Sequence, residues 1–191
     1  MRLNFKYIFL ILLSFVWLED SIFKTYDAHN SSNKTFYNKA GDSRVNLINS
    51  DINVTKLKFE LNGYSFEEVE NDFYKVNIDK GSPILIKGSP NLPKLNTSII
   101  IPDNKQMSIY IRDSKYIEID DINIIPSKGN FSRDIDPSTV PYEFSEVYEQ
   151  DSFYPQKIAQ LGEPYILRGL RGQGIIVNPI QYNPVSKTLR I

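Results

Sequence analysis

The sequence predicts an all-β fold, an antiparallel β-sandwich with one long irregular loop. From Ile52 onward, apolar and polar residues alternate with a period of two, as they do in half-buried strands. Turn-forming residues separate these stretches at intervals of roughly eight to twelve residues, which is typical of sandwiches. No stretch of useful length has the period of an amphipathic helix.

The first half of the predicted sandwich consists of strands joined by short turns. In residues 57–61, apolar side chains alternate with charged ones. The Asn-Gly pair at 62–63 predicts a hairpin turn, because both residues tolerate positive φ, and the chain then returns over residues 64–69. The Asn-Asp pair at 71–72 predicts the next turn, and the inward-facing side chains after it are Tyr74, Val76 and Ile78.

The middle of the chain carries three further strand signals and one irregularity. A Gly-Ser-Pro break at 81–83 is followed by an apolar stretch at 84–86, and residues 99–101 are wholly apolar, as in a central strand. Residues 107–111 alternate cleanly. Isoleucines two apart at 117 and 119 resume, after a gap of three, at 122 and 124, and this phase slip at Asp120-Asp121 predicts a β-bulge.

Residues 127–160 interrupt the strand rhythm. Their apolar side chains are sparse and mostly aromatic, with several prolines and acidic residues between them. A loop of more than about fifteen residues in a compact domain is usually functional or disordered. Aromatic residues are enriched in interface cores, so we expect this segment to pack partly on its own sheet and partly on a partner. Carboxylates at 134 and 136 have the spacing of calcium ligands, but the Asp-Pro-Ser that follows favours an Asx turn or helix cap.

The last thirty residues predict three short strands, at 165–167, 175–177 and 188–191, with a turn at 183–186. A sequence that stops on a strand suggests a protein that was cut here or one module of a longer protein.

Composition excludes several classes of function. The 23 acidic residues nearly balance the 22 basic ones, so net charge favours neither nucleic acid nor an anionic membrane as a partner. There is no cysteine, which excludes thiol nucleophiles, disulfides and cysteine-ligated zinc. The single histidine, His29, lies in a polar stretch. We therefore expect no catalytic residue, no metal site and no cofactor.

The beginning of the chain resembles an export signal. Arg2 and Lys6 precede an apolar stretch at 7–18, which has the length of a signal-peptide core and is shorter than the roughly twenty residues that span a bilayer. We divide the chain into a signal peptide or membrane leader with a signal-peptide helix (1–26), a polar linker (27–44) and the β-sandwich (45–191). This predicts a secreted, periplasmic or cell-surface protein that meets a membrane only through its leader.

Two motifs bracket residues 85–191. The first is Gly88-Ser89-Pro90-Asn91-Leu92-Pro93 followed by an apolar strand, and the second runs through the C-terminal strands, with Arg168, Arg171, Gly172, Tyr182, Asn183 and Pro184. Taken in this order and after an export signal, they resemble the amino-terminal propeptide domain of gingipain-type cysteine endopeptidases.

The resemblance implies a non-catalytic domain that assists folding of a gingipain-type catalytic domain, in cis or in trans, and blocks its cleft until cleavage. In that family a basic residue on an extended loop occupies the primary specificity pocket, which makes Arg133 and Lys128 the inhibitory candidates. Either residue also fits an ordinary solvated loop charge. Two other functions stay open, namely a structural or adhesive β-sandwich of a surface protein and a carbohydrate- or calcium-binding module.

Overall fold

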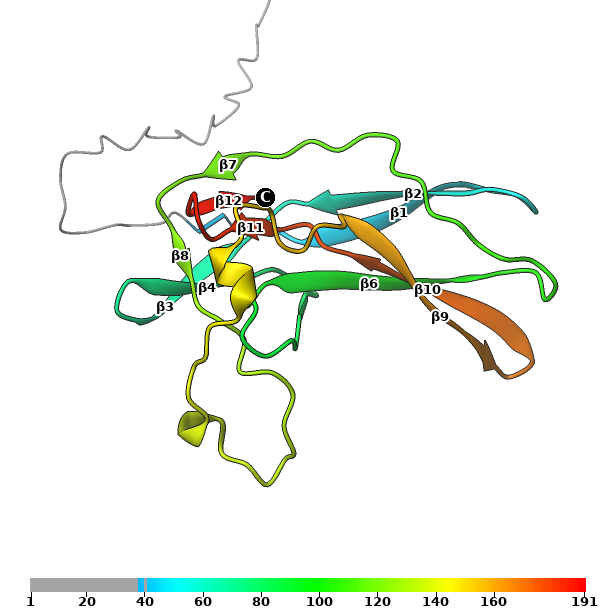
Figure 1. The fold of residues 1–191 in the computed structure, drawn as a ribbon. Coiled ribbons are helices and arrows are strands. Elements are labelled where there is room, and N and C mark those ends of the chain that lie inside the picture. The colour runs from blue at the N-terminus through cyan, green and yellow to red at the C-terminus, as the bar shows by residue number, and fades with distance from the viewer. Residues whose placement is uncertain (1–37, 40) are drawn as a thin grey trace, which may run out of the picture. The chain divides into compact units, whose positions relative to one another are not determined.

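The structure of the chain is a computed structural model that describes residues 38–39 and 41–191, all within the compact unit 36–191 (Figure 1). The predicted leader with its signal-peptide helix lies outside the described residues, as does most of the predicted linker. A bridge between Lys39 and Tyr64 and a strand that begins at Ser43 place the predicted boundary at 44–45 inside ordered sheet structure. Among the described residues, no helix is long and apolar enough to cross a membrane.

Strands dominate the described part of the chain, and the only helices there are two short 3₁₀ turns. The elements are β1 (Ser43–Ser50), β2 (Thr55–Leu61), β3 (Ser65–Glu70), β4 (Phe73–Asn77), β5 (Ser82–Pro83), β6 (Pro93–Ile100), β7 (Glu118–Ile119), β8 (Asn123–Ile124), η1 (Pro137–Thr139), η2 (Glu146–Glu149), β9 (Ala159–Leu167), β10 (Leu170–Val177), β11 (Gln181–Asn183) and β12 (Thr188–Arg190). The prediction of an all-β fold is confirmed.

The described strands form four small sheets, with orders β1-β2, β5-β6-β10-β9, β11-β12-β7 and β3-β4-β8. Neighbouring strands are antiparallel, except that β4 and β8 run parallel. The predicted central strand at 99–101 corresponds to the end of β6, which lies between β5 and β10. Figure 1 shows these sheets arranged in layers, with β6, β10 and β9 below β1 and β2.

Two apolar clusters lie between these sheets and hold them together. The larger one joins β4 and β8 to β11 and β12; its buried members are Tyr64, Tyr74, Val76, Ile84, Leu92, Ile122, Ile124, Ile180, Tyr182 and Leu189. The smaller one lies under β1-β2 and contains Leu95, Ile175 and Val177, with Leu57 and Phe59 of β2 packed against it. The alternation at 57–61 and 74–78 therefore marks the core-facing residues, as predicted.

The Asn-Asp turn at 71–72 is confirmed. Asn71 and Asp72 have φ of 48° and 62°, and they join β3 to β4 in a hairpin. Mirror-image turns of this kind match the right-handed twist of the flanking strands.

The predicted hairpin at 62–63 is wrong. β2 pairs with β1, and β3 pairs with β4, so the chain at 62–63 passes from one sheet to another. Gly63 is present for a different reason than turn formation, because a Cβ atom there would collide with the backbone of Gly41. Where two backbones approach this closely, glycine is required because it has no Cβ, just as it is favoured where φ is positive.

The predicted strand at 107–111 is also wrong. This segment runs extended between β6 and β7 (Figure 1), but no described residue supplies a backbone partner for it. Its side chains are exposed, up to 86% for Tyr110, except that Met107 is half-buried. Alternation of apolar and polar side chains indicates an extended chain, but a β-strand also needs the free edge of a sheet with which to form hydrogen bonds. Residues 84–86 likewise lie outside any strand, because β5 ends at Pro83.

The phase slip at 120–121 is a crossing between sheets and not a bulge. β7 pairs with β12, and β8 pairs with β4. Asp121 has φ of 58°, which turns the chain so that Ile122 can enter the core. A change of phase is expected whenever a chain changes sheets, because each sheet sets its own inward face.

Leu92→Ala should lower the free energy of unfolding by about 2–5 kcal/mol, because it leaves a cavity at a fully buried site. The matched control is Leu85→Ala, in the same segment but 49% exposed, which should change stability by no more than about 0.5 kcal/mol. Urea denaturation of the full chain measures both. Equal losses would contradict this assignment of the core.

Candidate functional site

The described chain leaves the sheets between β8 and η2 in a loop that projects away from them (Figure 1). We call residues 128–144 the projecting loop. Most of its residues are exposed. Its one helical element, η1, begins where the Asp136 side chain accepts a hydrogen bond from the Ser138 N–H at 2.9 Å, and this bond holds the pKa of Asp136 below its ordinary value. The prediction of a cap at this position is confirmed.

Both ends of the projecting loop are bound to the same short segment. Gly88 N–H donates to the Ser127 carbonyl at 2.9 Å, and Ser127 N–H donates to the Ser89 carbonyl at 2.7 Å. The Ser145 N–H and hydroxyl both donate to the Gly88 carbonyl, each at 3.0 Å. Gly88 therefore lies between the outgoing and returning ends and fixes their separation.

The glycine is required at this position for two reasons. Gly88 has φ of +80°, and a Cβ atom there would lie 2.9 Å from Cβ of Ser145. The residues after it continue the attachment, because Pro90 bridges Pro126 and Asn91 N–H donates to the Ile125 carbonyl. The Gly-Ser-Pro-Asn-Leu-Pro motif thus binds both ends of the projecting loop to the rest of the domain.

Aromatic side chains anchor the returning end in the core. The Tyr148 hydroxyl of η2 donates to the Ile124 carbonyl at 2.7 Å, and its ring meets Phe144 edge-on at 4.7 Å. Phe144 in turn contacts Phe73 of β4 at 5.6 Å between ring centroids. Burial raises the pKa of Tyr148 well above its ordinary value. The expectation that aromatics in this segment pack on the domain's own sheets agrees with these contacts.

Arg133 lies at a turn of the projecting loop. The Ile135 N–H donates to the Ser132 carbonyl at 3.1 Å, which places Arg133 at a corner of the turn. Its side chain is exposed and forms no ion pair or hydrogen bond with any described residue. The guanidinium is free to meet another molecule.

Lys128 has different surroundings. Its ammonium donates to the Pro137 carbonyl at 2.8 Å and lies 4.3 Å from the centre of the Tyr142 ring. The residue is half-buried. Both inhibitory candidates therefore belong to the same loop, but only Arg133 has an unengaged side chain there.

Of the residues in the C-terminal motif, Arg168, Arg171 and Gly172 shape the β9–β10 hairpin. Arg168 has φ of 50° and forms the turn with Gly169. Arg171 Nη1 donates to the carbonyls of Pro102, Asp103 and Lys105 at 3.1, 2.8 and 2.7 Å, which fixes the turn after β6. Gly172 is buried opposite Tyr165, where any side chain would meet the tyrosine ring.

The other three motif residues bind the C-terminal strands to the core. The Tyr182 hydroxyl donates to the Ile122 carbonyl at 2.9 Å, and its backbone exchanges two 2.8 Å hydrogen bonds with Tyr154. Asn183 accepts from the Val185 N–H at 3.1 Å and donates to Asp151 at 2.8 Å, while Pro184 is buried. Burial raises the pKa of Tyr182 as well. All six motif residues lie outside the projecting loop.

Sequence reasoning missed Tyr142 and Ser145 as supports of the projecting loop. A tyrosine next to proline and a lone serine carry no pattern of their own, because their partners lie 14 and 57 positions away. Gly88 was found through its motif but without its role. Only the pairing of distant backbone groups in the structure reveals it.

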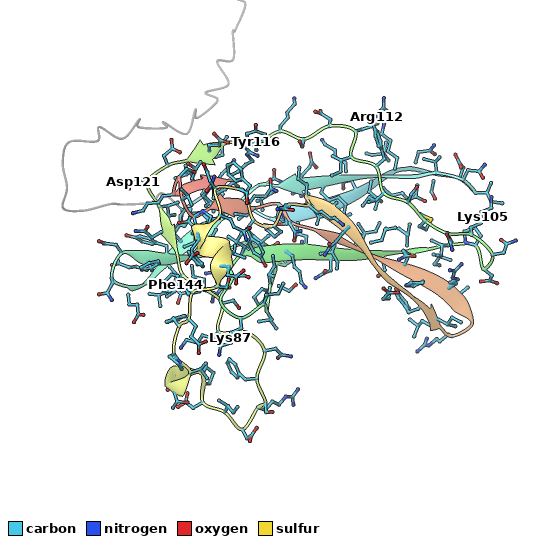
Figure 2. All side chains as sticks on the ribbon, in the orientation of Figure 1. Lys87, Lys105, Arg112, Tyr116, Asp121 and Phe144 are labelled. Atoms are coloured by element: carbon cyan, nitrogen blue, oxygen red, sulfur yellow. The ribbon has the colours of Figure 1, made fainter. Side chains whose placement is uncertain are left out.

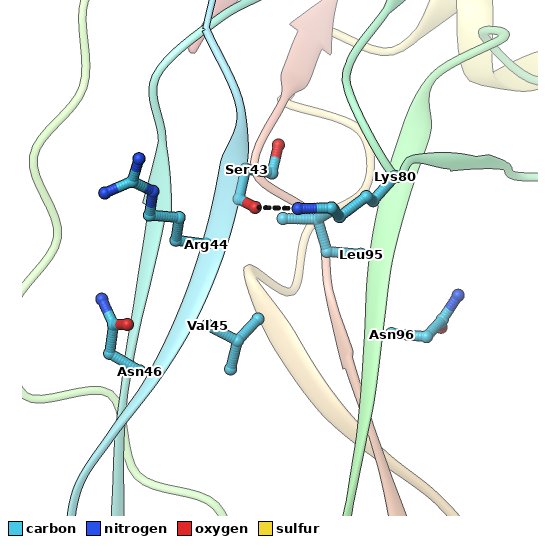
Figure 3. Close-up of a pocket in the computed structure, with 7 residues that line it drawn as sticks. All are labelled: Ser43, Arg44, Val45, Asn46, Lys80, Leu95 and Asn96. Carbon is cyan, nitrogen blue, oxygen red and sulfur yellow. Dashed lines mark hydrogen bonds between the residues drawn. The ribbon is translucent and has the colours of Figure 1, made fainter.

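The surface hollow in Figure 3 offers no catalytic arrangement. It has a volume of about 340 Å³ between β1 and β6, and Lys80 Nζ donates there to the Ser43 carbonyl at 3.3 Å. In the part of the chain that the structure describes, no group of three or more histidine, aspartate or glutamate side chains is placed to hold a metal ion.

Comparison with known proteins identifies the family. The profile of the Propeptide_C25 family matches residues 35–191. The chain belongs to this family. It is 37% identical to Gingipain R2 of Porphyromonas gingivalis over 151 residues and 39% identical to Gingipain R1 of the same organism over 148 residues. It spans about a fifth or less of the length of these relatives, since the matches cover 78% and 76% of this chain but 20% and 15% of theirs.

Two solved structures share the fold. The complex of the Porphyromonas gingivalis RgpB pro- and mature domains matches with a TM-score of 0.74 and 37% identity, covering 77% of each chain. A structure that concerns the zymogenic latency of gingipain K from Porphyromonas gingivalis matches with a TM-score of 0.67 and 22% identity, covering 80% of this chain and 88% of that one. The second shows likeness of fold alone.

The chain is therefore a gingipain-type propeptide domain and not a catalytic domain, because the family model and the similar solved pro-domain both describe the propeptide. Gingipains are exported proteases, so the family supports a secreted or surface protein in general terms. Neither an adhesive sandwich nor a carbohydrate- or calcium-binding module receives support from these relatives.

Gly88→Ala should destabilise the chain by about 2 kcal/mol or more, because it combines an unfavourable φ with overpacking against Ser145. Gly169→Ala is the matched control, with φ of +79° but no atom within 4 Å of the added Cβ, and should cost about 1 kcal/mol. Urea denaturation compares them. A larger loss at Gly169 would refute the assigned role of Gly88.

Stability should fall as pH rises above about 10. The unfolded tyrosines ionise near that pH, while burial keeps the pKa of Tyr148 and Tyr182 higher in the folded chain. The stabilising difference is complete at neutral pH and is lost toward alkaline pH. Melting temperatures between pH 7 and 11 measure this slope, which should become shallower in Tyr148→Phe. The exposed Tyr110→Phe is the control; an unchanged slope in Tyr148→Phe would contradict the assignment.

Proposed function

We propose that this propeptide domain binds the catalytic domain of a gingipain-type cysteine endopeptidase, assists its folding and keeps its cleft closed until cleavage. The projecting loop enters the cleft, and Arg133 occupies the primary specificity pocket. The observation that carries this proposal is an exposed, unengaged guanidinium on a loop whose two ends are both bonded to Gly88.

The choice of Arg133 over Lys128 rests on their contacts. To enter a pocket, Lys128 would have to leave both the Pro137 carbonyl and the Tyr142 ring, and it would lose those interactions on binding. On binding, Arg133 would lose only its hydrogen bonds with water. Its planar guanidinium also suits a carboxylate at the bottom of a specificity pocket, because the pair forms two parallel hydrogen bonds.

A loop fixed at both ends is a good inhibitor for thermodynamic reasons. Binding orders flexible groups, and each ordered side chain or loop reduces affinity. The hydrogen bonds of Gly88 and the anchoring of Tyr148 remove part of that cost before binding. The solved complex of the RgpB pro- and mature domains supports a catalytic domain as the partner class, since its propeptide fold is similar to this one.

We also propose that residues 1–26 are the leader that directs export, to the medium, the periplasm or the cell surface, and that the domain meets a membrane only through it. The family of exported proteases supports this location. The domain binds its catalytic partner either in cis, within a longer precursor, or in trans, and both routes use the same loop.

Arg133→Ala should weaken inhibition of the mature domain of RgpB by about 30-fold or more, since a buried charged anchor is worth roughly 2–5 kcal/mol. The assay measures hydrolysis of a peptide with a basic residue before the cleaved bond, at increasing concentrations of the full chain. Arg112→Ala is the matched control, because Arg112 is exposed but lies outside the projecting loop (Figure 2). The inhibition constant of this variant should stay within about twofold of that of the unmodified chain. Equal inhibition by the Arg133→Ala chain and the unmodified chain would refute the role of Arg133.

A further inference from the structure

We propose that Lys128 is a positioning residue that makes the projecting loop an inhibitor rather than a substrate. This inference rests on the proposed function of Arg133. It assigns to Lys128 a role inside the loop, in place of a role in the peptidase pocket.

An exposed arginine that binds in the cleft of a peptidase specific for basic residues is normally cleaved as a substrate. Hydrolysis would add water across the Arg133–Asp134 peptide bond, leaving a carboxylate on Arg133 and an amino group on Asp134. The two new ends must then separate before the cleft is free. A loop that holds its two sides together opposes both the distortion needed for attack and the separation that follows.

The contacts of Lys128 join the two sides of Arg133. Lys128 precedes the turn, and its ammonium donates at 2.8 Å to the carbonyl of Pro137, nine positions further along. The same ammonium lies over the Tyr142 ring on the returning side, at 4.3 Å. One side chain therefore connects the chain before the Arg133–Asp134 bond to the chain after it.

Both attachment points are themselves fixed. On the outgoing side, Gly129 N–H donates to the Ser127 hydroxyl at 3.2 Å, and Gly129 has φ of +85° where a Cβ would press on Lys87. Lys87 pairs with Glu143 of the returning side at 2.8 Å. The backbone that carries Lys128 is thus held at the base of the loop.

On the returning side, η1 is a small closed unit. Asp136 accepts from the Ser138 N–H, and the Thr139 hydroxyl and N–H donate to the Asp136 carbonyl at 2.8 and 3.0 Å. Pro137 adds a fixed φ. The carbonyl that receives Lys128 therefore belongs to a preorganised turn and not to a freely moving chain.

These contacts account for the chemistry of the residue at position 128. A carbonyl acceptor and an aromatic face together suit a cation with several donors on a long stem. After cleavage, the fragment beginning at Asp134 would remain attached through Pro137 and Tyr142 to the fragment ending at Arg133. The cleaved loop would stay in the cleft, and the inhibited state would persist.

The test uses the full chain and the mature domain of RgpB, and it follows cleavage after Arg133 by mass spectrometry alongside inhibition over time. Lys128→Met keeps an unbranched side chain that is only one atom shorter, but removes its charge and donors. It should accelerate cleavage after Arg133 by about tenfold and make inhibition transient. Lys128→Arg should retain most of the protection. Lys105→Met, an exposed lysine outside the projecting loop, is the matched control and should behave like the unmodified chain.

Two further measurements keep the outcomes distinct. Lys128→Met should lower the melting temperature by only a few degrees relative to the unmodified chain. Tyr142→Leu removes the aromatic partner of the ammonium and should likewise accelerate cleavage after Arg133, which provides a second variant if Lys128→Met proves unstable. Cleavage of Lys128→Met at the unmodified rate, while Arg133→Ala loses inhibition, would overturn the role of Lys128 and leave the proposed function standing. Undiminished inhibition by Arg133→Ala would overturn both.

Discussion

The backbone of Gly88 is the point on which the rest of this molecule's functional geometry depends. Its N–H and carbonyl bind the outgoing and returning ends of the projecting loop, at Ser127 and Ser145. No residue with a Cβ fits between them, because both the positive φ and the approach of Ser145 exclude it. A surface loop of this length would otherwise sample many conformations, and each would present Arg133 differently. The neighbours of Gly88 are themselves held, because Pro90 bridges Pro126 and Asn91 N–H donates to the Ile125 carbonyl.

Tyrosine hydroxyls of the core help to hold the backbone to which Gly88 and its neighbours are bound. Tyr182 and Tyr148 donate to the carbonyls of Ile122, just before β8, and Ile124, within β8. Tyr182 lies in β11, so a C-terminal strand helps to hold the segment that leads into the projecting loop.

The sequence predicted local features well and pairing poorly. Inward faces at 57–61 and 74–76 and the turn at 71–72 follow from side-chain period and backbone preference, which act over a few residues. The strand at 107–111 and the hairpin at 62–63 failed because strand partners are chosen by the whole fold. The loop itself was predicted from its break in rhythm. The difference between Arg133 and Lys128 was not, because it depends on a carbonyl and a ring further along a loop whose path the sequence does not reveal.

A chain without cysteine has to secure such a loop by contacts that are individually weak. A disulfide across the loop would hold the cleaved ends together permanently, whereas an ammonium on a carbonyl and an aromatic face contributes on the order of 1 kcal/mol per contact. Several such contacts together slow the opening of the loop without preventing it. On the proposed function this suits a temporary inhibitor, because the inhibited state outlasts cleavage after Arg133 and ends only when further cleavage releases the two ends of the loop. In this proposal, the contacts of Lys128 with Pro137 and Tyr142 set both how long inhibition lasts and how readily the loop is removed.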